Sequence, residues 1–159
     1  MIWDRTQNDV DVALRVIKEK IRLDPITMQP SNSESITTEE TEALKKGTLN
    51  VEDLNRIENK QIELKNIFND MGYWNTPKTN KTWDEAQVFD ANEFKRIVDN
   101  TDMLRKAFFV FGDTPNTPTA TYHYININAI EKILYDLGNM VDDVRSKYRE
   151  CNTFFCGEE

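Results

Sequence analysis

One segment of this 159-residue chain occurs twice, and the repeat constrains what the chain can fold into. Residues 54–58 read Leu-Asn-Arg-Ile-Glu and residues 127–131 read Ile-Asn-Ala-Ile-Glu, each at the front of an apolar-periodic run. A Trp-Asp pair precedes each copy, at residues 3–4 and 83–84. Internal duplication favours a symmetric helical scaffold over a single asymmetric active site. We therefore expect two copies of one unit, in which a Trp-Asp pair, a helix and a proline-containing link precede an Asn-x-Ile-Glu helix.

The first predicted helix begins after Thr6, because Thr6 can act as an N-cap with Asp9 three residues later. Its predicted apolar face consists of Val10, Leu14, Ile17 and Ile21. Pro25 should stop this helix, since the residue before a proline avoids the helical region. The Pro-, Ser- and Asn-rich residues 25–36 are then the predicted loop.

Two more helices are predicted before residue 74. Thr37 and Glu40 match the capping-box pattern and predict a short helix that ends before Gly47. Asn50 should begin a longer helix that stops at Gly72. Its apolar stripe, which is interrupted at Gln61, consists of Leu54, Ile57, Leu64, Ile67, Phe68 and Met71.

The second half of the sequence predicts two further helices. One begins near Asp90 and continues through Phe111, although residues 108–111 (Phe-Phe-Val-Phe) also fit a short strand. The other covers residues 124–148, with a seam at alternating spacings of three and four that suits packing along a partner helix. The seam consists of Ile127, Ile130, Leu134, Leu137, Val141, Val144 and Tyr148. Residues 151–157 have a strand-like composition and could pair with an edge strand of another protein.

These patterns predict an all-α protein of two pseudo-repeated helical hairpins packed as a bundle, with a short strand-like C-terminal tail. The predicted boundaries are residues 1–74 for the first repeat, 75–150 for the second and 151–159 for a docking tail. Within that tail, Phe154 and Phe155 are the expected contacts with a partner protein.

The charge and hydropathy of the chain narrow the classes of function. A net charge of −8 and a pI near 4.8 disfavour direct binding of nucleic acid, because like charges repel. No apolar stretch approaches the length that a membrane-spanning helix needs. The N-terminus lacks a basic region followed by an apolar run, so we expect no signal peptide.

The sequence predicts no catalytic or metal chemistry. Its one histidine, His123, lies far from Cys151 and Cys156, and a structural metal site needs four ligands. A thiol nucleophile with a histidine base is conceivable, but His123 falls at a predicted helix start, where it would act as a cap. The five glycines form no phosphate-binding loop. We expect a protein that is not an enzyme and that has no cofactor.

The repeated Asn-x-Ile-Glu elements have two interpretations. Each could present a polar recognition face, or each Asn could hydrogen-bond the preceding loop and fix the angle of its hairpin, which we favour. Glu58 and Glu131 would then pair with Arg5 and a basic residue of the second half, contributing orientation more than stability. The two repeated tryptophans are expected in the core. The predicted structural residues are Trp3, Arg5, Asn50, Asp53, Asn55, Glu58, Trp83, Asn128 and Glu131.

An ordered set of blocks resembles a module of virion proteins from phages and prophages of Firmicutes. Residues 3–10 resemble its Trp-x-Arg-Thr-x-x-Asp-Val opening, and residues 46–58 resemble its Lys-Gly-x-x-Asn-x-x-Asp-Leu-Asn-Arg-Ile-Glu core. Its later blocks are similar to residues 83–84, 100–105, 114–118, 128–134 and 155–158. The sequence departs from the pattern at His123, where the family has a Thr cap, and in the predicted loop 25–36, which lacks a short Gly turn.

The resemblance implies a non-enzymatic structural protein of a phage tail or phage-tail-like particle, present in multiple copies among baseplate or tail-fibre proteins. Such a protein is made in the host bacterial cytoplasm and ends in the virion. Longer relatives carry a fibre or receptor-binding domain after this module, whereas this sequence stops at Glu159, so we expect an adaptor. The alternative is an intracellular acidic inhibitor that mimics DNA, although acids and bases are interspersed along the sequence.

Overall fold

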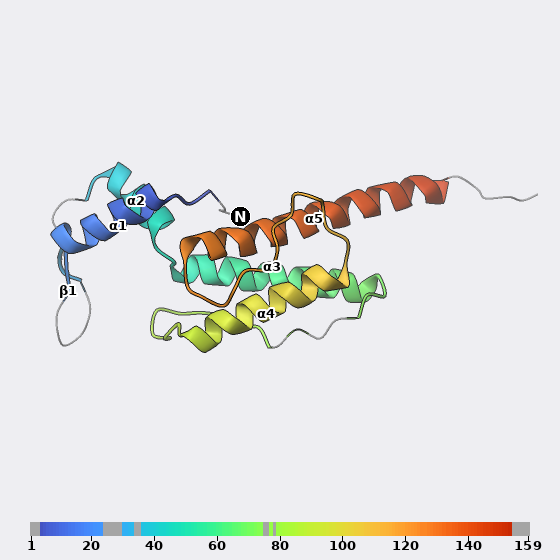
Figure 1. Cartoon of the computed structure of the whole chain (residues 1–159), viewed down its shortest axis with the longest axis horizontal. Helices are drawn as coiled ribbons and strands as arrows, with labels where there is room; N and C mark the ends of the chain where they lie inside the picture. Colours follow the sequence, from blue (N-terminus) through green and yellow to red (C-terminus); the bar gives the residue numbers. More distant parts are fainter. Residues whose placement is uncertain (1–3, 24–29, 34–35, 75–76, 78, 154–159) are drawn as a thin grey trace, which may run out of the picture.

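Helices dominate the computed structural model, which describes residues 4–23, 30–33, 36–74, 77 and 79–153. The all-α class is confirmed, with one small antiparallel sheet added to it (Figure 1). The elements are α1 (Gln7–Lys20), β1 (Ile21–Leu23), β2 (Pro30–Ser33), α2 (Thr38–Gly47), α3 (Val51–Asp70), α4 (Ala91–Ala107) and α5 (Tyr124–Thr153).

Local sequence signals set where the first three helices begin. The side chains of Thr6, Thr37 and Asn50 each accept a hydrogen bond from the main-chain N–H three residues later. An acidic side chain returns the bond to each cap, so all three predicted caps are confirmed as capping boxes. The helix α3 ends where predicted, because Gly72 adopts a φ of +84° that favours glycine.

The helices α1 and α2 pack against each other, and the β1–β2 hairpin connects them. Gly47 makes the close approach possible, since a Cβ there would collide with the main-chain oxygen of Asp9. The predicted apolar face of α1 is partly right: Val10, Ile17 and Ile21 are half-buried, but Leu14 is 59% exposed. The buried residues of this helix are Ala13 and Val16.

The region after α1 also differs from the prediction. The helix ends at Lys20, and residues 21–23 form β1, so Pro25 does not set the helix end. Residues 30–33, predicted as loop, form β2, with Ile21 opposite Ser33 and Leu23 opposite Pro30. Residues 30–33 have no alternating apolar pattern that would predict a strand. Their main-chain groups are instead hydrogen-bonded by pairing with β1.

The helices α3, α4 and α5 surround one hydrophobic core and contact one another in pairs. Most of the core side chains lie on these three helices: Leu54, Ile57, Leu64, Phe68, Phe94, Ile97, Val98, Leu104, Ile127, Ile130, Ile133, Leu134, Leu137 and Val141. Trp83 and Phe108 complete it from the neighbouring loops. The first predicted hairpin is not formed as expected, because α1 packs mainly on α2 and not on α3.

Two further predictions about helix ends are wrong. The helix α4 stops at Ala107, and residues 108–111 are neither helix nor strand. Phe108 has extended backbone angles and turns back into the core, so its burial does not require a helix. At the other end, α5 continues through Thr153, so the first three residues of the predicted strand-like tail are helical. Phe154 and Phe155 lie outside the described residues.

Within the part of the chain that the structure describes, no helix combines the length and apolar character needed to span a bilayer.

Candidate functional site: two buried ionic clusters

The two Asn-x-Ile-Glu elements form the centres of two buried polar clusters. We call the first the Glu58 cluster, which comprises Asn55, Glu58, Asn80, Trp83 and Arg96. The second is the Glu131 cluster, which comprises Arg5, Asp53, Arg56, Asn128 and Glu131. Among the residues whose side chains the structure describes, they contain most of the buried charged ones.

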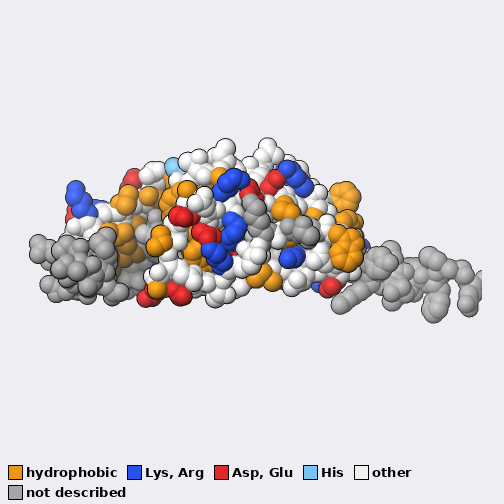
Figure 2. Space-filling view, turned by 90° about the horizontal axis from the view of Figure 1, so that it is seen from below, with side chains coloured by type: hydrophobic (Ala, Val, Ile, Leu, Met, Phe, Trp, Pro, Cys, Tyr) orange, Lys and Arg blue, Asp and Glu red, His pale blue; other side chains and the backbone are white. Residues whose placement is uncertain are grey.

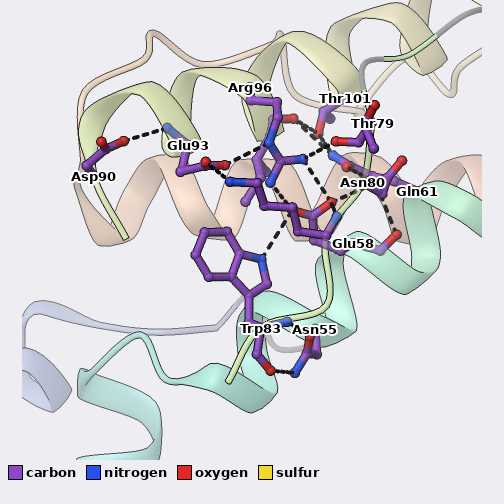
Figure 3. Close-up of polar contacts among 12 residues, drawn as sticks. Asn55, Glu58, Gln61, Thr79, Asn80, Trp83, Asp90, Glu93, Arg96 and Thr101 are labelled. Atoms are coloured by element: carbon purple, nitrogen blue, oxygen red, sulfur yellow. Dashed lines mark hydrogen bonds and ion pairs between the residues drawn. The ribbon is translucent and has the colours of Figure 1, made fainter. Parts of the chain in front are cut away.

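In the Glu58 cluster, Asn55 binds the main chain of an extended segment (Figure 3). Its Nδ2 donates to the carbonyl oxygen of Trp83 at 3.0 Å, and the Trp83 N–H donates to its Oδ1 at 2.7 Å. A side-chain amide that makes both bonds acts like a neighbouring strand, which fixes position 83 against α3. The expectation that Asn55 bonds the preceding loop is therefore wrong: its partner lies 28 residues later in the sequence.

Glu58 is fully buried and accepts hydrogen bonds from several directions. Asn80 Nδ2 donates at 2.7 Å, the Lys81 N–H at 3.3 Å and Trp83 Nε1 at 3.2 Å. The Arg96 guanidinium provides the compensating charge through both Nη atoms, one of them at 3.1 Å. A buried carboxylate with this many donors is stabilised in its charged form.

Arg96 extends the Glu58 cluster to the surface of α4. Its Nε donates to Glu93 at 2.8 Å, and its Nη1 donates to the Thr79 carbonyl at 3.0 Å. Burial disfavours its charge, but the hydrogen bonds to Glu58 and Glu93 outweigh this effect and raise the pKa of Arg96. Lys81 also pairs with Glu93, so two cations and two carboxylates alternate across this face.

The Glu131 cluster repeats this arrangement with residues from the chain start. Asn128 Nδ2 donates to the Arg5 carbonyl oxygen at 2.8 Å, so it also binds the main chain of an extended segment. The Arg5 side chain then donates from Nη1 to Glu131 Oε2 at 2.5 Å. Arg5 therefore occupies the place that Trp83 occupies in the Glu58 cluster: its main chain binds the Asn and its side chain binds the Glu.

A second arginine completes the Glu131 cluster. Arg56 Nη2 lies 2.6 Å from Glu131 and 2.6 Å from Asp53, and the Arg5 guanidinium lies 3.3 Å from Asp53. Burial disfavours the charge of Arg56, but its bonds to Glu131 and Asp53 outweigh this effect and raise its pKa. Two positive and two negative groups therefore balance, which a low-dielectric interior requires.

The predicted pairing of the carboxylates is partly right. Glu131 pairs with Arg5, and Glu58 pairs with Arg96 from the second half of the chain. These pairs are not at the surface, because both glutamates are 0% exposed. Trp83 is 4% exposed and belongs to the core, as predicted. Trp3 lies outside the described residues.

Sequence reasoning missed two features. Gln61 interrupts the apolar stripe of α3, yet it is fully buried and donates to the Ile97 carbonyl and to Thr101 Oγ1. The interruption is itself the detectable signal, since a polar residue in step with an apolar stripe predicts a buried hydrogen bond. Asp136 is also buried, where it accepts from Thr114 and Lys132 and attaches the loop before α5.

The remaining chemical candidates do not converge on a site. His123 lies at the start of α5, where its Nδ1 accepts from the main-chain N–H of Ile125, as a cap does. The side chains of Cys151 and Cys156 lie outside what the structure describes. Among the described residues, no three His, Cys, Asp or Glu side chains lie close enough to hold a metal ion. The two clusters act by holding elements together.

No family model matches the chain, and no curated protein or solved structure matches it at a significant level.

Proposed function

We propose that this chain is a non-enzymatic structural protein of a phage or phage-tail-like particle, an adaptor in the baseplate or tail-fibre attachment region. The observation that supports the proposal is the presence of two buried clusters of the same design, the Glu58 cluster and the Glu131 cluster. In each Asn-x-Ile-Glu element, the Asn side chain hydrogen-bonds the main chain of an extended segment and holds it against the bundle. Both Glu carboxylates are buried and surrounded by hydrogen-bond donors. Buried polar networks whose groups are all hydrogen-bonded make a structure rigid, which suits a structural protein.

The same clusters support the pseudo-repeat that the sequence suggests. In both, an Asn binds main chain, a Glu three residues later binds the side chain at that same position, and an arginine from another helix neutralises the Glu. The two Asn-x-Ile-Glu elements thus make the same kinds of bond, although the second binds Arg5 and not Trp3, the residue that the repeat aligns with Trp83. The ordered blocks that resemble the phage virion module provide the link to a tail particle.

An acidic DNA mimic is the weaker alternative. It would present rows of carboxylates on one face, whereas the face in Figure 2 has acidic and basic side chains side by side. Many described carboxylates are paired with lysine or arginine, as Asp102 is with Lys106 and Asp99 with Lys95. Pairing lowers the surface density of negative charge that mimicry of DNA needs.

The proposal is tested on particles purified from the encoding phage or prophage. We expect mass spectrometry to find the chain in stoichiometric amounts and cryo-electron microscopy to place it in the baseplate or at the fibre base. A chain lacking residues 152–159 should still fold and should fail to enter particles. Complete particles without this protein would overturn the structural role.

A further inference from the structure

The unit formed by α1, β1, β2 and α2 lies at one end of the bundle, beside the start of α3 and α5 (Figure 1). We call this unit, with residues 4–6 before it, the N-terminal arm. Its two helices pack on each other, and Lys20 pairs with Glu40 at 2.7 Å. Ala13 and Val16 are buried, but no described residue of the arm belongs to the hydrophobic core of the bundle. The apolar burial that holds α3, α4 and α5 together therefore does not extend into the arm.

The start of the chain changes from contacts within the arm to contacts with the bundle between one residue and the next. Asp4 Oδ2 lies 2.9 Å from Nζ of Lys46 near the end of α2, so Asp4 is bound within the arm. The Arg5 side chain is 2% exposed and lies in the Glu131 cluster. Among the described residues, every hydrogen bond and ion pair that joins the arm to the bundle involves Arg5, through its carbonyl oxygen or its guanidinium.

A single residue, Leu49, separates the arm from the bundle along the chain. Thr48 is bound to α2, because its main-chain N–H and its hydroxyl both donate to the Leu44 carbonyl. Asn50 is bound to α3, since it is the N-cap of that helix. Hinges in proteins are a few loop residues whose backbone angles change while the units on both sides stay rigid. Leu49 has the position of such a hinge.

The junction between the arm and the bundle contains a pocket of about 200 Å³. Its lining comes from both units, with Gln7 and Val10 on α1, Tyr122 just before α5 and Ile127 on α5. Closely packed interiors leave few voids larger than a water molecule. On this side, the arm therefore meets little steric resistance to a change of angle.

We propose that the N-terminal arm pivots as a unit at Leu49, and that Arg5 is the ionic latch that holds it closed on the bundle. In the closed form, the Arg5 guanidinium compensates Asp53 and Glu131. In the open form Arg5 is hydrated, and Arg56 remains as the cation beside the two carboxylates. Desolvation offsets much of the attraction within a buried ion pair, so exchanging the pair for hydrated charges is a reversible step that does not require unfolding.

Double electron–electron resonance between two spin labels measures the position of the arm. The labels are attached to an Arg15→Cys, Asn92→Cys chain that also carries Cys151→Ser and Cys156→Ser, because residues 15 and 92 are exposed on α1 and α4. We expect one narrow distance in this labelled parent chain. Arg5→Gln should broaden it and raise the open fraction at least about tenfold, since the closed form then buries two carboxylates against one arginine.

Lys46→Met is the matched control, because it removes a partly exposed ion pair inside the arm, and the distance should stay unchanged. A narrow, unchanged distance in Arg5→Gln would overturn the proposal. Loss of amide hydrogen-exchange protection throughout α1 and α2 in that variant would overturn it as well, because the arm would then unfold instead of pivoting.

A second measurement does not depend on a substitution in the buried cluster. In the labelled parent chain, urea below the main unfolding transition should broaden the distance distribution while the helical circular dichroism stays constant. Broadening that occurs only together with the loss of helix would refute a separate pivot. Neither failure would bear on the proposed structural role, which is tested by incorporation into particles.

Discussion

The replacement Arg96→Met tests whether the Glu58 cluster holds the bundle together. Glu58 is 0% exposed, and the Arg96 side chain is 12% exposed. Removing one partner of a buried ion pair costs roughly 3–5 kcal/mol, because the other charge stays buried without compensation. Asn80, Lys81 and Trp83 still donate to the carboxylate, so we expect a loss at the lower end, about 3 kcal/mol.

Urea unfolding followed by circular dichroism measures this loss, and a thermal melt should show a midpoint lower by roughly 6–12 °C for a chain of this size. The partner variant Glu58→Gln should cost about 2 kcal/mol, because its amide NH₂ faces groups that can only donate. The double variant should lose less than the sum by at least about 1 kcal/mol, since each single variant already removes the shared contact.

The control for this experiment is Lys106→Met, which removes a surface pair with Asp102 one helical turn away on the same helix. The Lys106 side chain is 72% exposed, so its loss should cost less than about 0.5 kcal/mol. Two results would show that the Glu58 cluster does not stabilise the bundle as we describe. One is a loss of unfolding free energy in Arg96→Met no larger than in Lys106→Met, and the other is additive losses in the Arg96→Met and Glu58→Gln variants.

Three further predictions address other parts of the molecule. Asn55→Leu should lower the free energy of unfolding by about 1–3 kcal/mol, because both of its main-chain bonds are lost; an unchanged urea midpoint would show that water replaces them. Gly47→Ala should push α1 away from α2 by the clash with the Asp9 carbonyl, which amide hydrogen exchange in α1 would detect as lost protection. The hydrogen bond from Lys81 lowers the pKa of Glu93 below its ordinary value of 4.5, so the stability it provides is present above that pH and is lost as the pH falls below it. Acid titration of Glu93→Gln should therefore show a shallower loss of stability than the parent chain, and parallel curves would contradict the assignment.

Signals confined to a few residues could be read from the sequence. The caps at Thr6, Thr37 and Asn50 and the stop at Gly72 all lie where predicted, because each depends on hydrogen bonds or backbone angles within one turn. The apolar face of α5 is likewise largely as predicted, since its spacing of three and four persists over several turns.

Predictions that needed a partner element were less successful. Leu14 was placed on the buried face of α1, but the direction from which α2 approaches decides that Ala13 and Val16 are covered. The period of residues 108–111 fits a helix or a strand, but the structure has neither there, and Phe108 stacks on Phe68 in the core. The intrinsic preference of a short apolar run for helix or strand is weak, so tertiary packing determines its conformation.

The repeat separates what the sequence determines from what only the tertiary structure determines. By itself the sequence determined that Asn55 and Asn128 stand at matching points of two helices, each with a glutamate three residues later. Only the tertiary structure decided that Asn55 binds Trp83, that Asn128 binds Arg5, and that Arg96 and Arg56 neutralise the two buried glutamates. Helical period depends on neighbours within one turn, whereas these partners lie from 28 to 123 residues away, and the route of the chain between them determines which groups meet.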